Sequence, residues 1–297
     1  MGYEMKTAQQ LIEEFNPESE LDLAQETYFP SGLPDARYAS ILLSDLPEVD
    51  KPHLAGVCHE KVKRDITGCR VWFPAGSKSK VLKLKFHVLI DSPNWNFYFI
   101  QVPEGMTFKL NGPDHSVLNF SSKRVSANIR CSGGEGAHYR GCRVVIGENS
   151  FIAGARVVLL NTDLLVGRNA LWSDEILVQG SNQHGIVALP EKKLVDYPRN
   201  RIELEPHVWI GRRAIVSSGA KIGTGSIVGT GALVAKPYPP TCIIGGNPGR
   251  IIKRNRTWAF NLDKIEDREL EIIDSLPVFE ESKMSWRARL TNRLTRR

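Results

Sequence analysis

Branched aliphatic residues recur at every sixth position in the C-terminal half of the chain, and a small residue follows most of them. The aliphatic positions are Leu204, Ile210, Val216, Ile222, Val228 and Val234. A period of six fits neither the 3.6-residue turn of an α-helix nor a flat strand, which recurrent glycines would weaken. The pattern predicts a solenoid in which each six-residue unit forms one short strand and one corner, with the aliphatic side chain inside.

A less regular block with the same period precedes this one. Its positions are Ile146, Ile152 and Val158 and, after a two-residue insertion, Val166, Trp172 and Val178. Neighbouring coils of such a solenoid pair in parallel ladders and bury one continuous stack of side chains. The alternative is a β-sandwich, whose strands would recur about every 8 to 12 residues with variable loops. We therefore expect a parallel β-helix over residues 141–253.

The remaining segments have other patterns. Residues 1–60 predict a partly helical, loop-rich segment, with twelve acidic and three basic side chains. Residues 61–140 alternate between apolar and polar positions and are broken by prolines, which predicts a small β-rich N-terminal domain. Residues 254–297 predict a helical tail, and its last fifteen residues hold six basic and no acidic side chains.

Composition narrows the class of protein. With 297 residues, 41% hydrophobic and 24% charged, the balance is that of a globular protein. No apolar run approaches the ~18 residues of a membrane helix, and the first residues lack a secretory pattern, so we expect a cytoplasmic protein. Five widely spaced cysteines predict reduced thiols rather than a disulfide framework or a zinc ribbon. The basic tail predicts a weak contact with an acidic membrane surface, and we expect no nucleic-acid partner.

The stretch from Ile202 to Lys253, which contains VWIG and GGNPGRIIK, resembles the hexapeptide-repeat acyltransferases. It is similar to the C-terminal half of the galactoside, maltose and polysaccharide O-acetyltransferase branch. The resemblance implies a mainly β fold with a left-handed parallel β-helix. It also implies a homotrimer with clefts between subunits, acetyl-CoA as the co-substrate and no metal.

A polar, proline-containing segment of residues 181–203 interrupts the six-residue pattern, and long insertions in compact repeats are usually functional or disordered. In the acyltransferases an extended loop leaves the helix at this place, and a histidine at its start faces the acyl-CoA cleft. That position matches His184. Imidazole, with a pKa near 6.5, is suited to remove a proton from an attacking hydroxyl at neutral pH. We therefore expect His184 to be the general base.

The resemblance implies further site residues on both sides of the reaction. The positions expected to contact the acceptor are Asn161, Asp163, Asn182 and Trp209. The positions expected to contact CoA are Trp209, Arg212, Thr230, Ala235, Lys236, Arg250 and Lys253. Cations such as Arg250 and Lys253 suit the phosphates of CoA, although related sugar acetyltransferases often have Ser or Gly where Arg212 stands.

These features together predict an O-acetyltransferase that moves an acetyl group directly from acetyl-CoA to a saccharide hydroxyl. Two alternatives stay open, an N-acetyltransferase acting on an amino sugar and a non-catalytic trimeric scaffold. A γ-class carbonic anhydrase would need three histidines at a subunit interface, but besides His184 and His207 the nearest, His138, precedes the regular repeats. A nucleotidyltransferase is disfavoured because Gly133–His138 lacks the glycine spacing of a phosphate loop.

Overall fold

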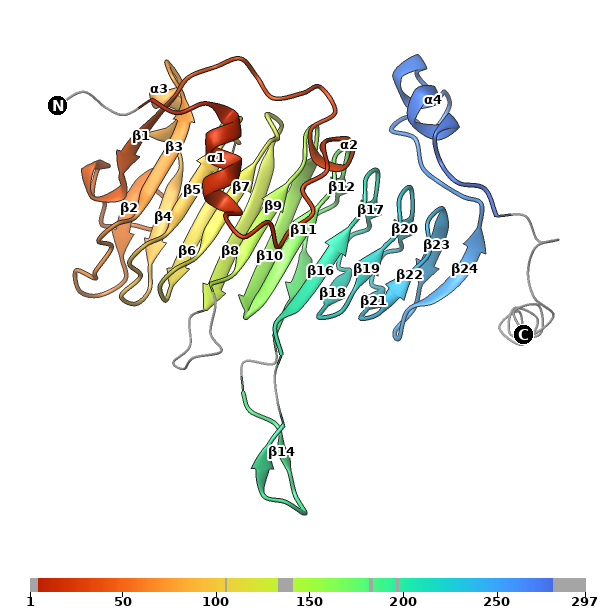
Figure 1. Cartoon of the computed structure of the whole chain (residues 1–297). Coiled ribbons are helices and arrows are strands. Elements are labelled where there is room, and N and C mark those ends of the chain that lie inside the picture. The colour runs from red at the N-terminus through yellow and green to blue at the C-terminus, as the bar shows by residue number, and fades with distance from the viewer. Residues whose placement is uncertain (1–4, 105, 133–140, 182–183, 196–197, 280–297) are drawn as a thin grey trace.

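The computed structural model describes the chain except residues 1–4, 105, 133–140, 182–183, 196–197 and 280–297. The chain winds into a prism of stacked coils that runs from the N-terminal to the C-terminal half (Figure 1). In the described residues, one face is a nine-stranded sheet. Its strands are β1 (Tyr38–Leu42), β3 (Arg70–Pro74), β5 (Asn96–Phe99), β7 (Ser116–Asn119), β9 (Arg143–Ile146), β11 (Thr162–Val166), β16 (Asn200–Leu204), β19 (Lys221–Ile222) and β22 (Pro237–Tyr238).

A second, thirteen-stranded sheet supplies the other two faces. One path contains β2 (Gly56–His59), β4 (Lys85–Val88), β6 (Thr107–Asn111), β8 (Val125–Ser132), β10 (Phe151–Leu160), β12 (Leu171–Trp172), β17 (Trp209–Ile210), β20 (Ile227–Val228), β23 (Cys242–Gly245) and β24 (Arg250–Arg254). The branch contains β13 (Ile176–Gln179), β18 (Ile215–Ser217) and β21 (Leu233–Val234). The path and the branch divide at β10, because the first residues of β10 pair with β12 and its later residues pair with β13.

The register of the C-terminal coils confirms the period read from the sequence. Leu204 lies opposite Ile222, Ile210 opposite Val228 and Val216 opposite Val234, all in parallel ladders. The two members of each pair are separated along the chain by three of the six-residue units, so one coil contains one unit for each face of the prism. All six side chains are buried in the interior. The predicted parallel β-helix is therefore confirmed.

Residues 61–140 are rich in strands, as expected, but they do not form a separate domain. Strand β7 pairs with β9 and β8 pairs with β10, both in parallel, so the N-terminal strands continue the sheets of the repeat region. The parallel ladders therefore cross the expected boundary at residue 140. Here unequal lengths of chain separate the successive partners on the first face, which are Val71, Phe97, Val117 and Val144. Loops of unequal length hide the six-residue period.

The N-terminal segment packs on the outside of the first face. Helix α1 (Ala8–Phe15) begins at a capping box in which Thr7 and Gln10 exchange hydrogen bonds, and it buries Leu11 and Phe15. A short helix, α2 (Gln25–Tyr28), follows, and the Phe29 ring stacks on Phe120 with 4.7 Å between centroids. Two more short helices, η1 (Leu43–Asp45) and α3 (Lys78–Val81), lie among the first coils.

At the other end of the prism, β24 folds back antiparallel onto β23 and closes the stack. The chain then forms helix α4 (Asp267–Asp274), which also begins with a capping box. The end of the expected basic tail, including Trp286 and Arg293, lies outside the described residues. Among the described residues, no helix has the length and apolar character needed to cross a bilayer.

Candidate active site

The excursion predicted to carry the catalytic histidine leaves the prism at Gly180 and returns at β16, so its return is a few residues earlier than expected. Two hydroxyls from neighbouring coils fix the departure point. Thr162 Oγ1 donates to the Gly180 carbonyl over 2.6 Å, and Ser218 Oγ donates to the same oxygen over 2.8 Å. A Cβ at Gly180 would lie 2.8 Å from Leu159 Cδ2, so the packed corner admits only glycine without displacement.

A buried ion-pair cluster fixes the return side of the excursion. The carboxylate of Asp163, 1% exposed, accepts from Arg199 Nη2 at 2.5 Å and from Arg143 Nη2 at 3.1 Å. Arg143 also pairs with Glu20 at 2.9 Å, and Arg199 donates to the Gly141 carbonyl. A buried carboxylate requires such partners, since an unpaired charge in the interior is strongly destabilising. Asp163 therefore ties the returning chain to the prism.

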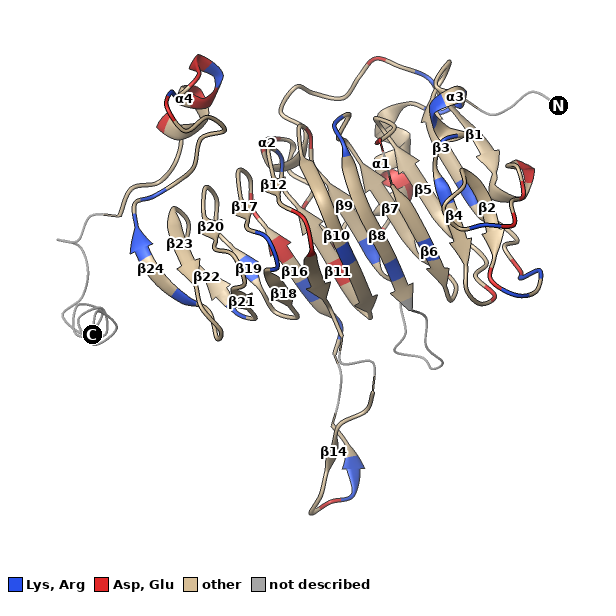
Figure 2. Cartoon of the chain, turned by 180° about the vertical axis from the view of Figure 1, so that it is seen from behind, with Lys and Arg blue, Asp and Glu red and all other residues tan. Residues whose placement is uncertain are grey.

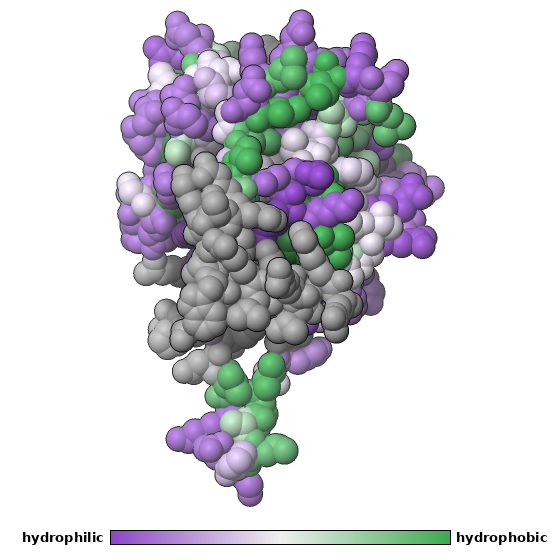
Figure 3. Space-filling view, turned by 90° about the vertical axis from the view of Figure 1, so that its right-hand side faces the viewer, coloured by the Kyte–Doolittle hydropathy of each residue, from purple (hydrophilic) through white to green (hydrophobic). Residues whose placement is uncertain are grey.

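His184 lies near the start of the excursion and is exposed. Beyond it the chain forms a hairpin of β14 (Val187–Ala188) and β15 (Lys193–Leu194), which extends away from the prism (Figure 1). The Val195 amide donates to the Ile186 carbonyl over 2.7 Å at the base of the hairpin. Apolar side chains gather on this hairpin, with Leu189 81% and Leu194 70% exposed (Figure 3). Asn182, an expected acceptor contact, lies outside the described residues.

Three other predicted residues share the corner of the excursion. Asn161 is buried in a left-handed conformation, with φ of 47°, just before Thr162, and its carbonyl accepts from the Asn200 amide. Ala235 and Lys236 lie two coils beyond the start of the excursion. They follow Val234, which pairs with Val216, and Val216 in turn pairs with Val178. Ala235 and Lys236 are both exposed. The structure therefore brings these residues, Asp163 and the base of the His184 segment to one edge of the prism.

The remaining predicted residues lie on a different corner or at the end of the stack. Arg212 and Thr230 are exposed in successive turns, where the Gly231 amide donates to the Arg212 carbonyl over 2.9 Å. The Arg212 guanidinium pairs with Asp174 at 2.6 Å. Arg250 and Lys253 are exposed on β24, which carries basic side chains at the end of the prism (Figure 2). Within one chain the expected CoA contacts therefore lie apart, at two corners and at the end of the stack.

Trp209 is half-buried, and it lies on a third side with His207 and Trp258. Its indole N–H lies 3.5 Å from Ser173 Oγ, and its ring centroid lies 6.5 Å from that of Trp258. The Trp258 ring stacks on His207 at 4.2 Å, and its indole N–H donates to the His207 carbonyl. Burial lowers the pKa of His207. These contacts give His207 a packing role, in contrast to His184, which is exposed.

Sequence reasoning missed Arg143 and Arg199, the two cations that hold Asp163. A usable signal was present, because an aspartate inside an aliphatic repeat requires a cationic partner. Both arginines stand at coil positions next to Asp163, Arg143 one coil before it and Arg199 directly before the paired strand β16. The pairing depends on the register between coils, which the interrupted repeat did not supply.

The fold and these corners define the class that the chain resembles, the hexapeptide-repeat acetyltransferases with a left-handed parallel β-helix, and the predicted fold class is confirmed. No family model matches the chain. It is 34% identical over 128 residues to the polysialic acid O-acetyltransferase of Escherichia coli O1:K1 / APEC, a match that covers 43% of this chain and 41% of that protein. A chloramphenicol acetyltransferase of Klebsiella aerogenes is 39% identical over 71 residues, covering 20% of this chain and 34% of that protein. The chain thus spans less than half of the curated relatives it matches.

A solved structure supports the same class. The crystal structure of the polySia-specific acetyltransferase NeuO superimposes with a TM-score of 0.55 at 25% identity. The match covers 63% of this chain and 87% of that chain. The resemblance read from residues 202–253 is therefore confirmed.

Proposed function

We propose that the protein transfers an acetyl group from acetyl-CoA to a hydroxyl group of a saccharide. The observation that carries the proposal is the exposed His184 on an excursion whose two ends are bonded to the prism by Thr162, Ser218 and Asp163. Similarity to a polysialic acid O-acetyltransferase supports a saccharide as the acceptor. The amino-sugar and scaffold alternatives have no structural observation in their favour.

His184 acts as the general base in this proposal. Its imidazole takes the hydroxyl proton as the acceptor oxygen bonds to the thioester carbonyl carbon, which forms a tetrahedral oxyanion. Collapse of that intermediate breaks the carbon–sulfur bond, and the imidazolium returns its proton to the departing CoA sulfur. No covalent acyl-enzyme is needed. Asp163 acts as a positioning residue through Arg199, while Asn161, Asn182 and Trp209 contact the acceptor.

The CoA contacts are proposed for the residues with matching chemistry. The exposed cations Lys236, Arg250 and Lys253 bind its phosphates, with Arg212 released from Asp174 to join them. Thr230 and Ala235 stand at tight corners, where the pantetheine arm can approach backbone N–H and C=O groups. Because these residues lie at two corners and at the end of the stack, we propose a homotrimer in which one subunit completes the cleft of its neighbour. The exposed apolar hairpin supplies a surface for that contact.

A hydroxyl-acceptor screen tests this function. The full chain is incubated with acetyl-CoA and a panel that contains polysialic acid, neutral oligosaccharides and amino sugars, and free CoA is measured. We expect CoA release only with a saccharide present, and an alkali-labile ester in the product. An alkali-stable amide would replace O-transfer with N-transfer. If no member of the panel causes CoA release and acetyl-CoA also fails to bind, the result would support the scaffold alternative.

A further inference from the structure

Two cysteines and a histidine meet inside the prism, one to two coils before the excursion. Ser116 lies opposite Arg143 in parallel register, so the preceding residues, His115 and Cys142, are neighbours on adjacent coils. Cys131 lies in β8, on the far side of the corner that leads to Cys142. All three side chains are buried, with His115 1% exposed and both cysteines 0%. Buried apolar side chains, among them Val117, Ile129 and Val144, belong to the same core.

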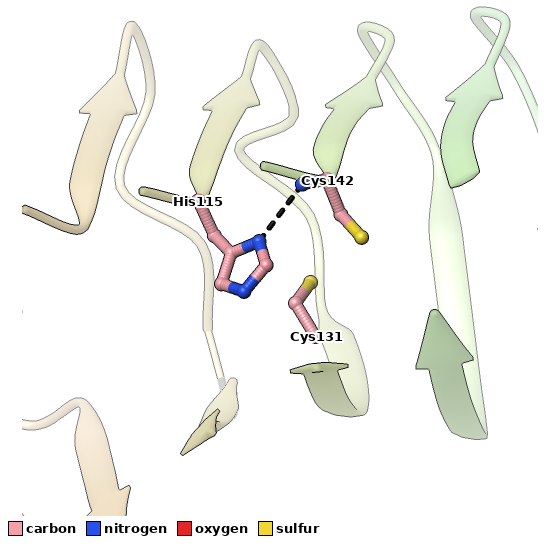
Figure 4. A group of neighbouring side chains, drawn as sticks. All are labelled: His115, Cys131 and Cys142. Atoms are coloured by element: carbon pink, nitrogen blue, oxygen red, sulfur yellow. Dashed lines mark hydrogen bonds between the residues drawn. The ribbon is translucent and has the colours of Figure 1, made fainter. Parts of the chain in front are cut away.

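The three side chains point toward one another (Figure 4). One ring nitrogen and the two sulfur atoms all lie within 4.8 Å of one another. Three atoms so spaced are all within about 2.8 Å of a common point, whereas zinc bonds measure about 2.3 Å to sulfur and about 2.0 Å to nitrogen. Side-chain shifts of less than an ångström therefore suffice to close the three atoms around an ion.

One nitrogen of the His115 imidazole accepts a hydrogen bond, and the other has no partner among the described residues. Its Nδ1 accepts from the Cys142 amide over 2.8 Å, so the lone pair is on that atom. Its Nε2 is buried and has no hydrogen-bond partner among the described residues, while the ring lies edge-on against Trp95 at 4.8 Å.

We propose that His115, Cys131 and Cys142 bind one zinc ion inside the prism, a site independent of acetyl transfer. The two thiols release their protons to solvent as the sulfur–zinc bonds form, and the Nδ1 lone pair replaces its hydrogen bond to the amide with a bond to zinc. Two thiolates, one neutral imidazole and Zn²⁺ sum to zero charge, which an apolar interior tolerates. Soft sulfur with imidazole is a ligand set that suits zinc rather than magnesium or calcium.

The position of the site suggests what the ion does. It joins the end of β8 to the start of β9, the two sides of the segment that contains residues 133–140, and it links the coil of His115 to the next. A surface pocket of about 500 Å³ lies outside this corner, and His115, Gly141 and Arg143 are among its lining residues. Three protein ligands leave the fourth position of a tetrahedral zinc ion to a further ligand. The ion therefore cross-links neighbouring coils inside the prism.

Zinc titration of the full chain tests the site. Reduced protein is stripped with a chelator, titrated with Zn²⁺ against a chromophoric competitor, and assayed for zinc by mass spectrometry after gel filtration. We expect one zinc per chain, with affinity at least tenfold lower in Cys131→Ser and Cys142→Ser. The control Cys58→Ser, a buried cysteine of β2 outside the cluster, should bind like wild type.

A second probe removes any dependence on the folding of the variants. Co²⁺ added to stripped wild-type protein should give a thiolate-to-cobalt charge-transfer band, and zinc should bleach it. Sub-stoichiometric zinc without that band would overturn the proposal, as would undiminished binding by both cysteine variants. A Cys131–Cys142 disulfide in protein purified without reductant, together with failure of the reduced protein to bind zinc, would overturn it in favour of a redox pair. Acetyl transfer is not measured in either experiment, so its outcome stays separate.

Discussion

The N-terminal and C-terminal coils build one prism from very different sequences. From Leu204 to Val234 every coil consists of three six-residue units and fills the interior with branched aliphatics. Between Val71 and Val144 the paired positions are unevenly spaced along the chain. The interior there holds an aromatic cluster of Trp95, Phe86, Phe97, Phe99 and Phe108. Inter-coil register, rather than sequence period, therefore defines the fold.

The two regions also differ on their outer surfaces. The N-terminal segment covers the first face of the early coils, where Phe15 packs edge-on against Tyr98 at 5.8 Å. The later coils carry exposed residues that are proposed for chemistry, among them His184, Lys236 and Arg250. Irregular coils that are covered serve stability, and regular coils with open corners present the site. Four substitutions test this division.

Removing a central ring from the aromatic interior should have the largest effect. Phe97→Ala leaves a cavity among four other rings and should lower the free energy of unfolding by about 3 to 5 kcal/mol. Val216→Ala in a regular coil removes fewer atoms and should cost about 2 kcal/mol. Urea denaturation measures both, and equal losses would contradict a special role for the aromatic cluster.

Neutralising the buried carboxylate at the base of the excursion should come next. Asp163→Asn leaves Arg143 and Arg199 facing an uncharged amide, and we expect a loss of about 2 to 4 kcal/mol in unfolding free energy. The excursion should also become more sensitive to proteolysis. The matched control is Glu203→Gln, whose carboxylate pairs with Lys221 on the same face but is partly exposed, and it should cost under about 1 kcal/mol. Equal effects would refute the positioning role.

Removing the Arg250 side chain from β24 should affect only CoA binding. Arg250→Ala removes a proposed phosphate contact and should weaken CoA binding about tenfold, or about 1.4 kcal/mol. Calorimetry with CoA and dephospho-CoA separates the contribution of the 3′-phosphate. The variant should bind dephospho-CoA almost as well as wild type does, and Arg37→Ala in the N-terminal segment should behave like wild type with both. A comparable loss for the two ligands would reject a 3′-phosphate contact.

The smallest effect concerns the pH dependence of stability. Burial lowers the pKa of His207 in the fold, an effect that Arg168 reinforces and Glu269 opposes, so the native state favours the neutral ring. This contribution to stability is present above the ordinary pKa of about 6.5 and is lost as the pH falls from there toward the folded-state pKa. His207→Asn, which suits the left-handed backbone, should flatten the Tm profile between about pH 7 and pH 5. An unchanged profile would contradict this assignment.

The sequence predicted the regular part of the fold because each aliphatic position there faces its counterpart one coil away. It did not predict that residues 61–140 join the same prism, since variable corner loops, such as the one between Phe99 and Val117, hide the spacing. For the site, the break in the repeat located His184 and the excursion. The salt bridges of Asp163 and the meeting of His115 with Cys142 depend on inter-coil register, which no local pattern contains.

The kcat of His184→Ala shows whether the excursion delivers an imidazole to an acyl-transfer site. It is measured with acetyl-CoA and the best saccharide from the screen, beside the exposed-histidine control His53→Ala. We predict a ~10² to 10⁴-fold fall in kcat for His184→Ala with acetyl-CoA affinity nearly unchanged, and wild-type turnover for His53→Ala. Retention of wild-type kcat by His184→Ala would contradict the account.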